Sequence, residues 1–169
     1  MKVIKEIVFI LTLVASTAAS AADYDVRGIS SDADAGLMLK DWMADLGYRV
    51  DAPKDRPSVF LENEKGGKLV LVPKVSTSGV DRLIIYKNFK GKPSNVKSEE
   101  LRALINEINA SFNVCSAYLD SDGDLSLRYN LLFDDKLSPR LLRVTLEHVD
   151  ATVSVIISKH RDRFRPFFD

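Results

Sequence analysis

The sequence predicts an α+β fold in which three helices pack on an antiparallel sheet. Apolar residues recur at helical spacing within residues 31–46, 98–112 and 138–164. Between these segments lie short stretches typical of strands, separated by turns rich in glycine and proline. The connections between the strands are too short for parallel crossovers, so we expect an antiparallel meander. The predicted order is helix, three or four strands, helix, two strands, helix.

The first helix is predicted over residues 31–46. Ser31 and Asp34 have the spacing of a capping box, and apolar residues follow at helical intervals as far as Leu46. Gly47 supplies the left-handed residue that commonly ends a helix. We expect Trp42 to anchor this helix in the core.

Three or four strands are predicted to follow the first helix. Gly66 and Gly67 form a turn between two of them, and the segment after Gly79 starts another. The predicted strands cover residues 48–50, 58–62, 68–72 and 80–86.

The second half of the chain is predicted to contain a helix, a hairpin and the longest helix. Ser98 begins the first of these helices, and acidic residues in its first turn suit the helix dipole. The hairpin pairs residues 114–120 with residues 125–133. Ser138 caps the last helix, whose aromatic end is expected to fold back on the domain. The basic and aromatic tail could alternatively suit an anionic lipid surface or a nucleic-acid backbone.

The N-terminus has the features of a secretory signal peptide. Lys2 and Lys5 precede an apolar run too short to span a bilayer, and small residues follow it. We predict a signal peptide over residues 1–21 with cleavage after Ala21, a flexible lead over residues 22–30 and a single domain over residues 31–169. The mature protein is expected to be periplasmic or secreted, and to meet the membrane only through the transient signal peptide. An uncleaved N-terminal anchor is the alternative.

The composition excludes some classes of function. Lys and Arg number 24, as do Asp and Glu, so the charge balance offers no footprint for nucleic acid. Cys115 is the only cysteine, and an internal disulfide is therefore impossible. Its thiol is expected to be buried; pairing between chains is the alternative.

Several of these features together resemble the YbjN family of bacterial sensory transduction regulators. They are the end of the first helix at residues 46–50, the asparagines Asn106 and Asn109, the hairpin at Tyr118-Leu119-Asp120, and the last helix that begins at Ser138. The resemblance implies a fold similar to that of type III secretion chaperones, which commonly dimerise and hold polypeptides without chemistry. Those chaperones act in the cytosol, so their role does not transfer to a chain with an export signal.

Three aspartates around the hairpin turn are candidates for a calcium site. Asp120, Asp122 and Asp124 provide the oxygen ligands that calcium prefers. Their spacing does not match an EF-hand, because Gly123 stands at the fourth position instead of the sixth and Leu131 at the twelfth. A hairpin turn explains the same residues without a metal. We therefore predict neither a metal nor a cofactor.

The remaining candidates concern partner binding and catalysis. Asn106, Asn109 and Tyr118 could form a recognition surface for a partner, although Asn109 could instead satisfy backbone groups where its helix ends. His148 and His160 are too few and too far apart in sequence for a zinc site.

The chain contains no catalytic or nucleotide-binding motif. We predict a non-enzymatic protein that binds an unidentified protein or peptide and could form a homodimer. The alternatives are a small-molecule or calcium sensor, followed by a hydrolase.

Overall fold

The computed structural model describes residues 22–53, 56–62, 67–76 and 80–168, and the predicted signal peptide lies outside these residues. The main sheet is antiparallel and has six strands in the order β2-β3-β4-β5-β7-β6. Its strands are β2 (Arg49–Asp51), β3 (Val59–Glu62), β4 (Lys68–Lys74), β5 (Asp81–Phe89), β6 (Ser116–Leu119) and β7 (Leu125–Phe133). The sheet confirms the predicted α+β class.

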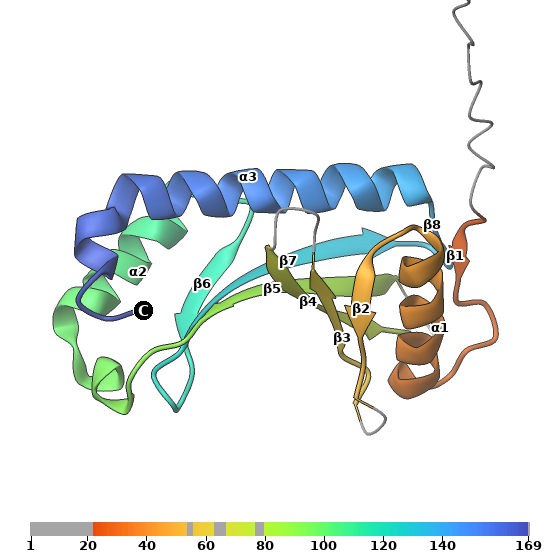
Figure 1. The fold of residues 1–169 in the computed structure, drawn as a ribbon, viewed down its shortest axis with the longest axis horizontal. Coiled ribbons are helices and arrows are strands. Elements are labelled where there is room, and N and C mark those ends of the chain that lie inside the picture. Colours follow the sequence, from red (N-terminus) through yellow and green to blue (C-terminus); the bar gives the residue numbers. More distant parts are fainter. Residues whose placement is uncertain (1–21, 54–55, 63–66, 77–79, 169) are drawn as a thin grey trace, which may run out of the picture.

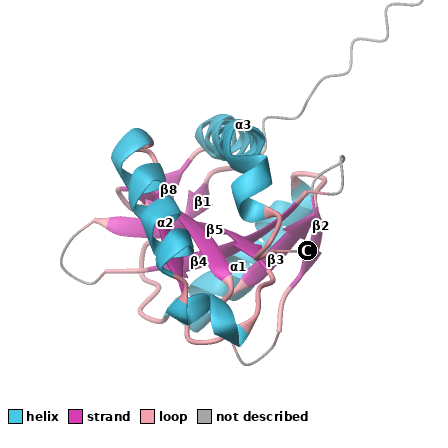
Figure 2. Cartoon of the chain, turned by 90° about the vertical axis from the view of Figure 1, so that its left-hand side faces the viewer, coloured by secondary structure: helices cyan, strands magenta, loops and turns pink. Residues whose placement is uncertain are grey.

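Three helices accompany the sheet: α1 (Asp32–Asp45), α2 (Glu99–Ser111) and α3 (Pro139–Phe164). Figure 1 shows α3 lying along the sheet, with α2 at one end of the molecule and α1 at the other. Figure 2 looks nearly along the axis of α3 from the α2 end. The short helix η1 (Pro93–Lys97), where only a break was predicted, precedes α2. Among the described residues, no helix has both the length and the apolarity to cross a membrane.

Serine side chains begin all three main helices, as predicted. The hydroxyl oxygens of Ser31, Ser98 and Ser138 each accept a hydrogen bond from the backbone N–H three residues later, at 3.1–3.2 Å. Such caps satisfy N–H groups that have no partner inside the helix. Gly47 follows α1 with a φ of +86°, as expected of the residue that stops a helix.

The segment before α1 is packed, which corrects the prediction of a flexible lead over residues 22–30. Strand β1 (Tyr24–Asp25) pairs with β8 (Lys136–Leu137). Tyr24 is 2% exposed, its ring stacks on Trp42 at 5.4 Å, and its hydroxyl donates to the Ala35 carbonyl at 2.6 Å. A two-residue strand has no periodicity to recognise, because its partners lie far away in sequence.

The two faces of the sheet differ in their surroundings. Alternate strand residues such as Leu71, Leu83 and Leu127 join the buried residues of all three helices in one core. The intervening residues point to the opposite face, which we call the open face. Its residues include Phe60, Arg82, Ile84, Tyr86, Tyr118, Arg128 and Leu132. No described helix packs on the open face, and Leu132 on it is 61% exposed.

Candidate functional site

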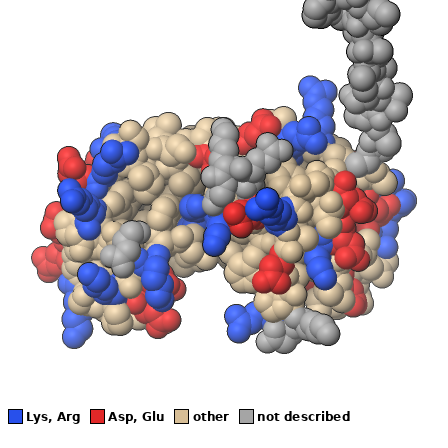
Figure 3. All heavy atoms as spheres, viewed as in Figure 1, with Lys and Arg blue, Asp and Glu red and all other residues tan. Residues whose placement is uncertain are grey.

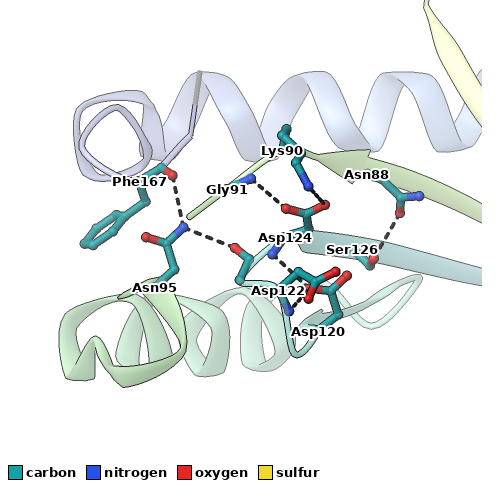
Figure 4. Close-up of polar contacts among 10 residues, drawn as sticks. Asn88, Lys90, Gly91, Asn95, Asp120, Asp122, Asp124, Ser126 and Phe167 are labelled. Atoms are coloured by element: carbon teal, nitrogen blue, oxygen red, sulfur yellow. Dashed lines mark hydrogen bonds and ion pairs between the residues drawn. The ribbon is translucent and has the colours of Figure 1, made fainter. Parts of the chain in front are cut away.

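The hairpin turn between β6 and β7 uses its aspartates to bind its own backbone. One carboxylate oxygen of Asp120 accepts hydrogen bonds from the N–H groups of Asp122 at 2.9 Å and Asp124 at 3.0 Å. Gly123 takes a φ of +83°, a conformation that favours glycine. These are the contacts of a turn in which aspartate caps the chain (Figure 4).

Asp124 joins this turn to the segment after β5. Its Oδ1 accepts the Gly91 N–H at 2.9 Å, and its Oδ2 pairs with the Lys90 ammonium at 3.1 Å. The backbone bond from Gly91 and the contact with Lys90 lower the pKa of the Asp124 carboxyl. Among the described residues, no group of three or more His, Cys, Asp or Glu residues is placed to hold a metal ion.

Asn95 connects the turn to the C-terminal segment. Its side chain is buried, and its Nδ2 donates to the carbonyls of Gly123 at 3.1 Å and Phe167 at 3.0 Å (Figure 4). Gly91 and Gly123 lie so close that a Cβ on Gly91 would overlap the Gly123 carbonyl oxygen. We call Gly91, Asn95, Gly123, Asp124 and Phe167 the hairpin latch.

The sequence does not indicate the roles of Gly91 and Asn95, because the partners of Asn95 are 28 and 72 residues away. The only local signal was the break at Gly91 and Pro93, which does not indicate what the neighbouring asparagine contacts.

The two candidate asparagines of α2 have different surroundings. The carboxamide of Asn109 accepts the N–H of Ala117 at 2.7 Å and donates to its carbonyl at 3.0 Å. Asn109 therefore binds the edge of β6, and not the end of its own helix. Asn106 is exposed and makes no hydrogen bond with another described side chain. The structure places the third candidate, Tyr118, on the open face, where it is 37% exposed.

Tyr118 lies beside Arg128 and Tyr86. The guanidinium of Arg128 is 5.8 Å from the centre of the Tyr118 ring, and Arg128 is the cross-strand partner of Tyr86. Burial and the neighbouring Tyr118 raise the pKa of the Tyr86 hydroxyl. The Nε of Arg128 is buried and has no hydrogen-bond partner among the described residues. These side chains form a cationic and aromatic part of the open face.

The two histidines have different surroundings. His148 is exposed, whereas His160 is 4% exposed, and its Nδ1 lies 4.0 Å from Glu107. Burial lowers the pKa of His160. Neither histidine makes a hydrogen bond with a hydroxyl or thiol in the described part of the chain.

Cys115 is half-buried, in a position that only partly matches the predicted core thiol. It precedes β6 and lines a small cavity with Val149 and Val153 of α3. Burial raises the pKa of its thiol, which disfavours the reactive thiolate form.

A cleft of about 740 Å³ lies between α3 and strands β2, β3 and β4. Leucines from three elements give it an apolar floor, and charged side chains of both signs form its rims. The lining residues are Leu46, Gly47, Tyr48, Arg49, Leu61, Glu62, Leu69, Arg143, Leu146, Glu147 and Asp150. None of its charged residues forms an ion pair with another described residue. The sequence does not indicate this cleft, because its walls come from residues 46–69 and 143–150, which are far apart in the chain.

Comparisons with known proteins identify the family. The YbjN family model, described as "Putative bacterial sensory transduction regulator", matches residues 37–157. The crystal structure of YbjN from E. coli, described as "a putative transcription regulator", superposes with a TM-score of 0.59 at 16% identity. The match covers 79% of this chain and 94% of that one, and at this identity the likeness concerns the fold alone. No curated protein matches the chain. Because the family model spans most of the chain, the protein belongs to the YbjN family.

Proposed function

We propose that this YbjN-family protein is an exported, non-enzymatic regulatory module that binds a protein or peptide segment in the cleft between α3 and β2–β4. The cleft itself is the observation that supports the proposal. It combines an apolar floor with charged rims, the arrangement found in interfaces that bury an apolar centre within a polar border.

The chemistry of the cleft suits a polypeptide ligand. Leu46 and Tyr48 are partly exposed in the cleft and can contact apolar side chains of a bound segment. Leu61, Leu69 and Leu146, which also line it, are at most 5% exposed. Arg143 and Glu147 on the rim can pair with both acidic and basic side chains of that segment. A mixed rim of this kind provides specificity more than affinity.

Two sets of observations support the remaining parts of the proposal. The sequence features of residues 1–21 support export. A non-enzymatic role is supported by the separation of both histidines from any hydroxyl or thiol partner among the described residues, since activated nucleophiles need an adjacent base. The family description as a regulator agrees with this role.

Photocrosslinking in the source bacterium tests the proposed cleft. Benzoylphenylalanine replaces Arg143 on the cleft rim in one strain and the exposed Arg102 of α2 in a control strain. We expect a discrete protein adduct from position 143 that is absent at position 102. Equal adducts at both positions, or none at either, would contradict binding in the cleft. N-terminal sequencing of the mature protein tests export, which requires a chain that starts near Ala22.

A small-molecule sensor is the second candidate function. The volume of the cleft, about 740 Å³, lies in the range of ligand pockets. A metabolite that raises the melting temperature of the protein, but not that of an Arg143→Glu variant, would favour this candidate.

A further inference from the structure

The open face carries positive charge within an apolar surface. Across β5, β7 and β6, its outward positions include Arg82 and Arg128 and no acidic residue. Leu132, opposite Arg82, is 61% exposed, and Tyr86, opposite Arg128, is partly exposed; Ile84 between them is buried. Neither arginine forms an ion pair within the described residues. A ligand for this surface needs carboxylates on both sides of an apolar patch.

The outer face of α1 has the complementary composition. Leu37 is 52% exposed and Met38 is 36% exposed, and both lie between Asp34 and Asp41 along the helix. Asp34, Asp41 and Asp45 are exposed and make no ion pair with other described residues. Figure 3 shows acidic side chains gathered over α1. This helix face therefore carries acid, apolar surface and acid in succession.

The spacing of the charges on the two surfaces is similar. At the rise of an α-helix, Asp41 and Asp45 lie about 10 Å and about 16 Å from Asp34 along α1. At the spacing of antiparallel strands, Arg82 and Arg128 lie about 14 Å apart on the open face. Flexible arginine and aspartate side chains can bridge the difference between these values.

We propose that the outer face of α1 in one copy docks on the open face of a second copy, with Asp34 and Asp41 beside the arginines and Leu37 over Tyr86 and Leu132. This contact uses neither wall of the cleft, so it goes beyond the proposed function and is independent of it.

The position of the two surfaces determines the kind of assembly. α1 packs on the inner face of the sheet, so its outer face and the open face point in opposite directions. Two copies cannot satisfy both contacts reciprocally, and the contact is head-to-tail. One helix face on a sheet buries less area than a standard stable interface, so the association is weak and sensitive to salt.

Sedimentation velocity of the purified protein tests this inference. We expect the average mass to rise beyond that of a dimer between micromolar and millimolar concentration, and to fall when salt is added. A double variant with Asp34→Ser and Asp41→Ser blocks the helix face, and one with Arg82→Ser and Arg128→Ser blocks the sheet face. Each should weaken association about tenfold or more.

Mixing the two double variants gives the decisive result. In the mixture, one variant keeps only its sheet face and the other keeps only its helix face. We therefore expect dimers and no larger species. The single Arg82→Ser variant replaces the sheet double variant if that one fails to fold, and Arg102→Ser on α2 controls for the loss of positive charge. Wild-type protein that stays monomeric, stops at dimers, or associates regardless of these variants would overturn the inference. Any of these results would leave the crosslinking test of the cleft unaffected.

Discussion

The side chain of Asn109 binds both backbone groups of Ala117, accepting its N–H at 2.7 Å and donating to its carbonyl at 3.0 Å. β6 is an edge strand of the sheet, and such edges present unpaired groups that can recruit another strand. Asn109 hydrogen-bonds the N–H and carbonyl groups of Ala117 in the middle of β6 and connects the strand to α2.

Asn109→Ala should therefore destabilise the protein. Ala117 would lose two hydrogen bonds at a partly buried position, which lowers the free energy of unfolding by about 1–3 kcal/mol. Urea unfolding followed by circular dichroism measures this loss. Asn106→Ala is the control, because Asn106 is exposed on the same helix and does not bind Ala117; it should change stability by less than about 0.5 kcal/mol. Equal effects of the two variants would contradict the assignment.

Gly91→Ala should loosen the hairpin latch. The new Cβ would overlap the carbonyl oxygen of Gly123, so the loop and the turn must move apart. We expect a loss of about 1–3 kcal/mol, typical of overpacking. Thermal unfolding compares this variant with Ser94→Ala, a nearby exposed position that should remain close to wild type. A melting temperature unchanged by Gly91→Ala would show that the contact is not tight.

The fold was largely predictable from the sequence because its signals are local. Ser31, Ser98 and Ser138 mark helix starts through bonds that span only three residues, and the structure contains all three. The alternation of buried and outward residues along the strands is also a local signal, because it depends only on residues that are neighbours in the chain. These patterns predicted the order of helices and strands.

The candidate sites were less predictable because their contacts are distant in sequence. Asn95 donates a hydrogen bond to Phe167, which is 72 residues away, and the ring of Tyr24 packs against Trp42 and Phe133. The sequence predicts that Asn109 satisfies backbone groups, but its partner is Ala117 of β6 and not the end of its own helix. A single sequence indicates which residues can form such bonds and does not indicate which segments meet.

Calcium should leave the stability of the protein unchanged. Calcium requires six to eight oxygen ligands, whereas Asp120 and Asp124 already accept backbone hydrogen bonds and Asp124 pairs with Lys90. We expect equal melting temperatures in calcium chloride and in EDTA, since a ligand stabilises only the state it binds. A rise in calcium that disappears in Asp122→Ala would instead support the calcium sensor.

His160 lies where α3 departs from helical geometry, with a φ of −116°. Its charged neighbours are Glu107, Lys159 and Arg163, and Arg163 donates to Glu107 at 2.5 Å. The ring contacts Phe164 edge-on, and its Nε2 has no hydrogen-bond partner among the described residues. Protonation would thus place a charge on a buried ring beside two cations and one carboxylate.

Acidification should destabilise the protein through His160. Burial lowers the pKa of this residue in the folded state below the ordinary 6.5, so the unfolded chain binds the proton more readily. Its contribution to stability is present above pH 6.5 and is lost as the pH falls through the lowered pKa. We expect His160→Phe to flatten the decline in unfolding free energy between about pH 7 and pH 5, measured by urea titration. His148→Gln, at an exposed position, should preserve the decline. The pKa of the Glu107 carboxyl is lowered, so protonation of Glu107 changes stability only in more acidic solution. A decline in unfolding free energy that persists in His160→Phe would therefore contradict its assignment to His160.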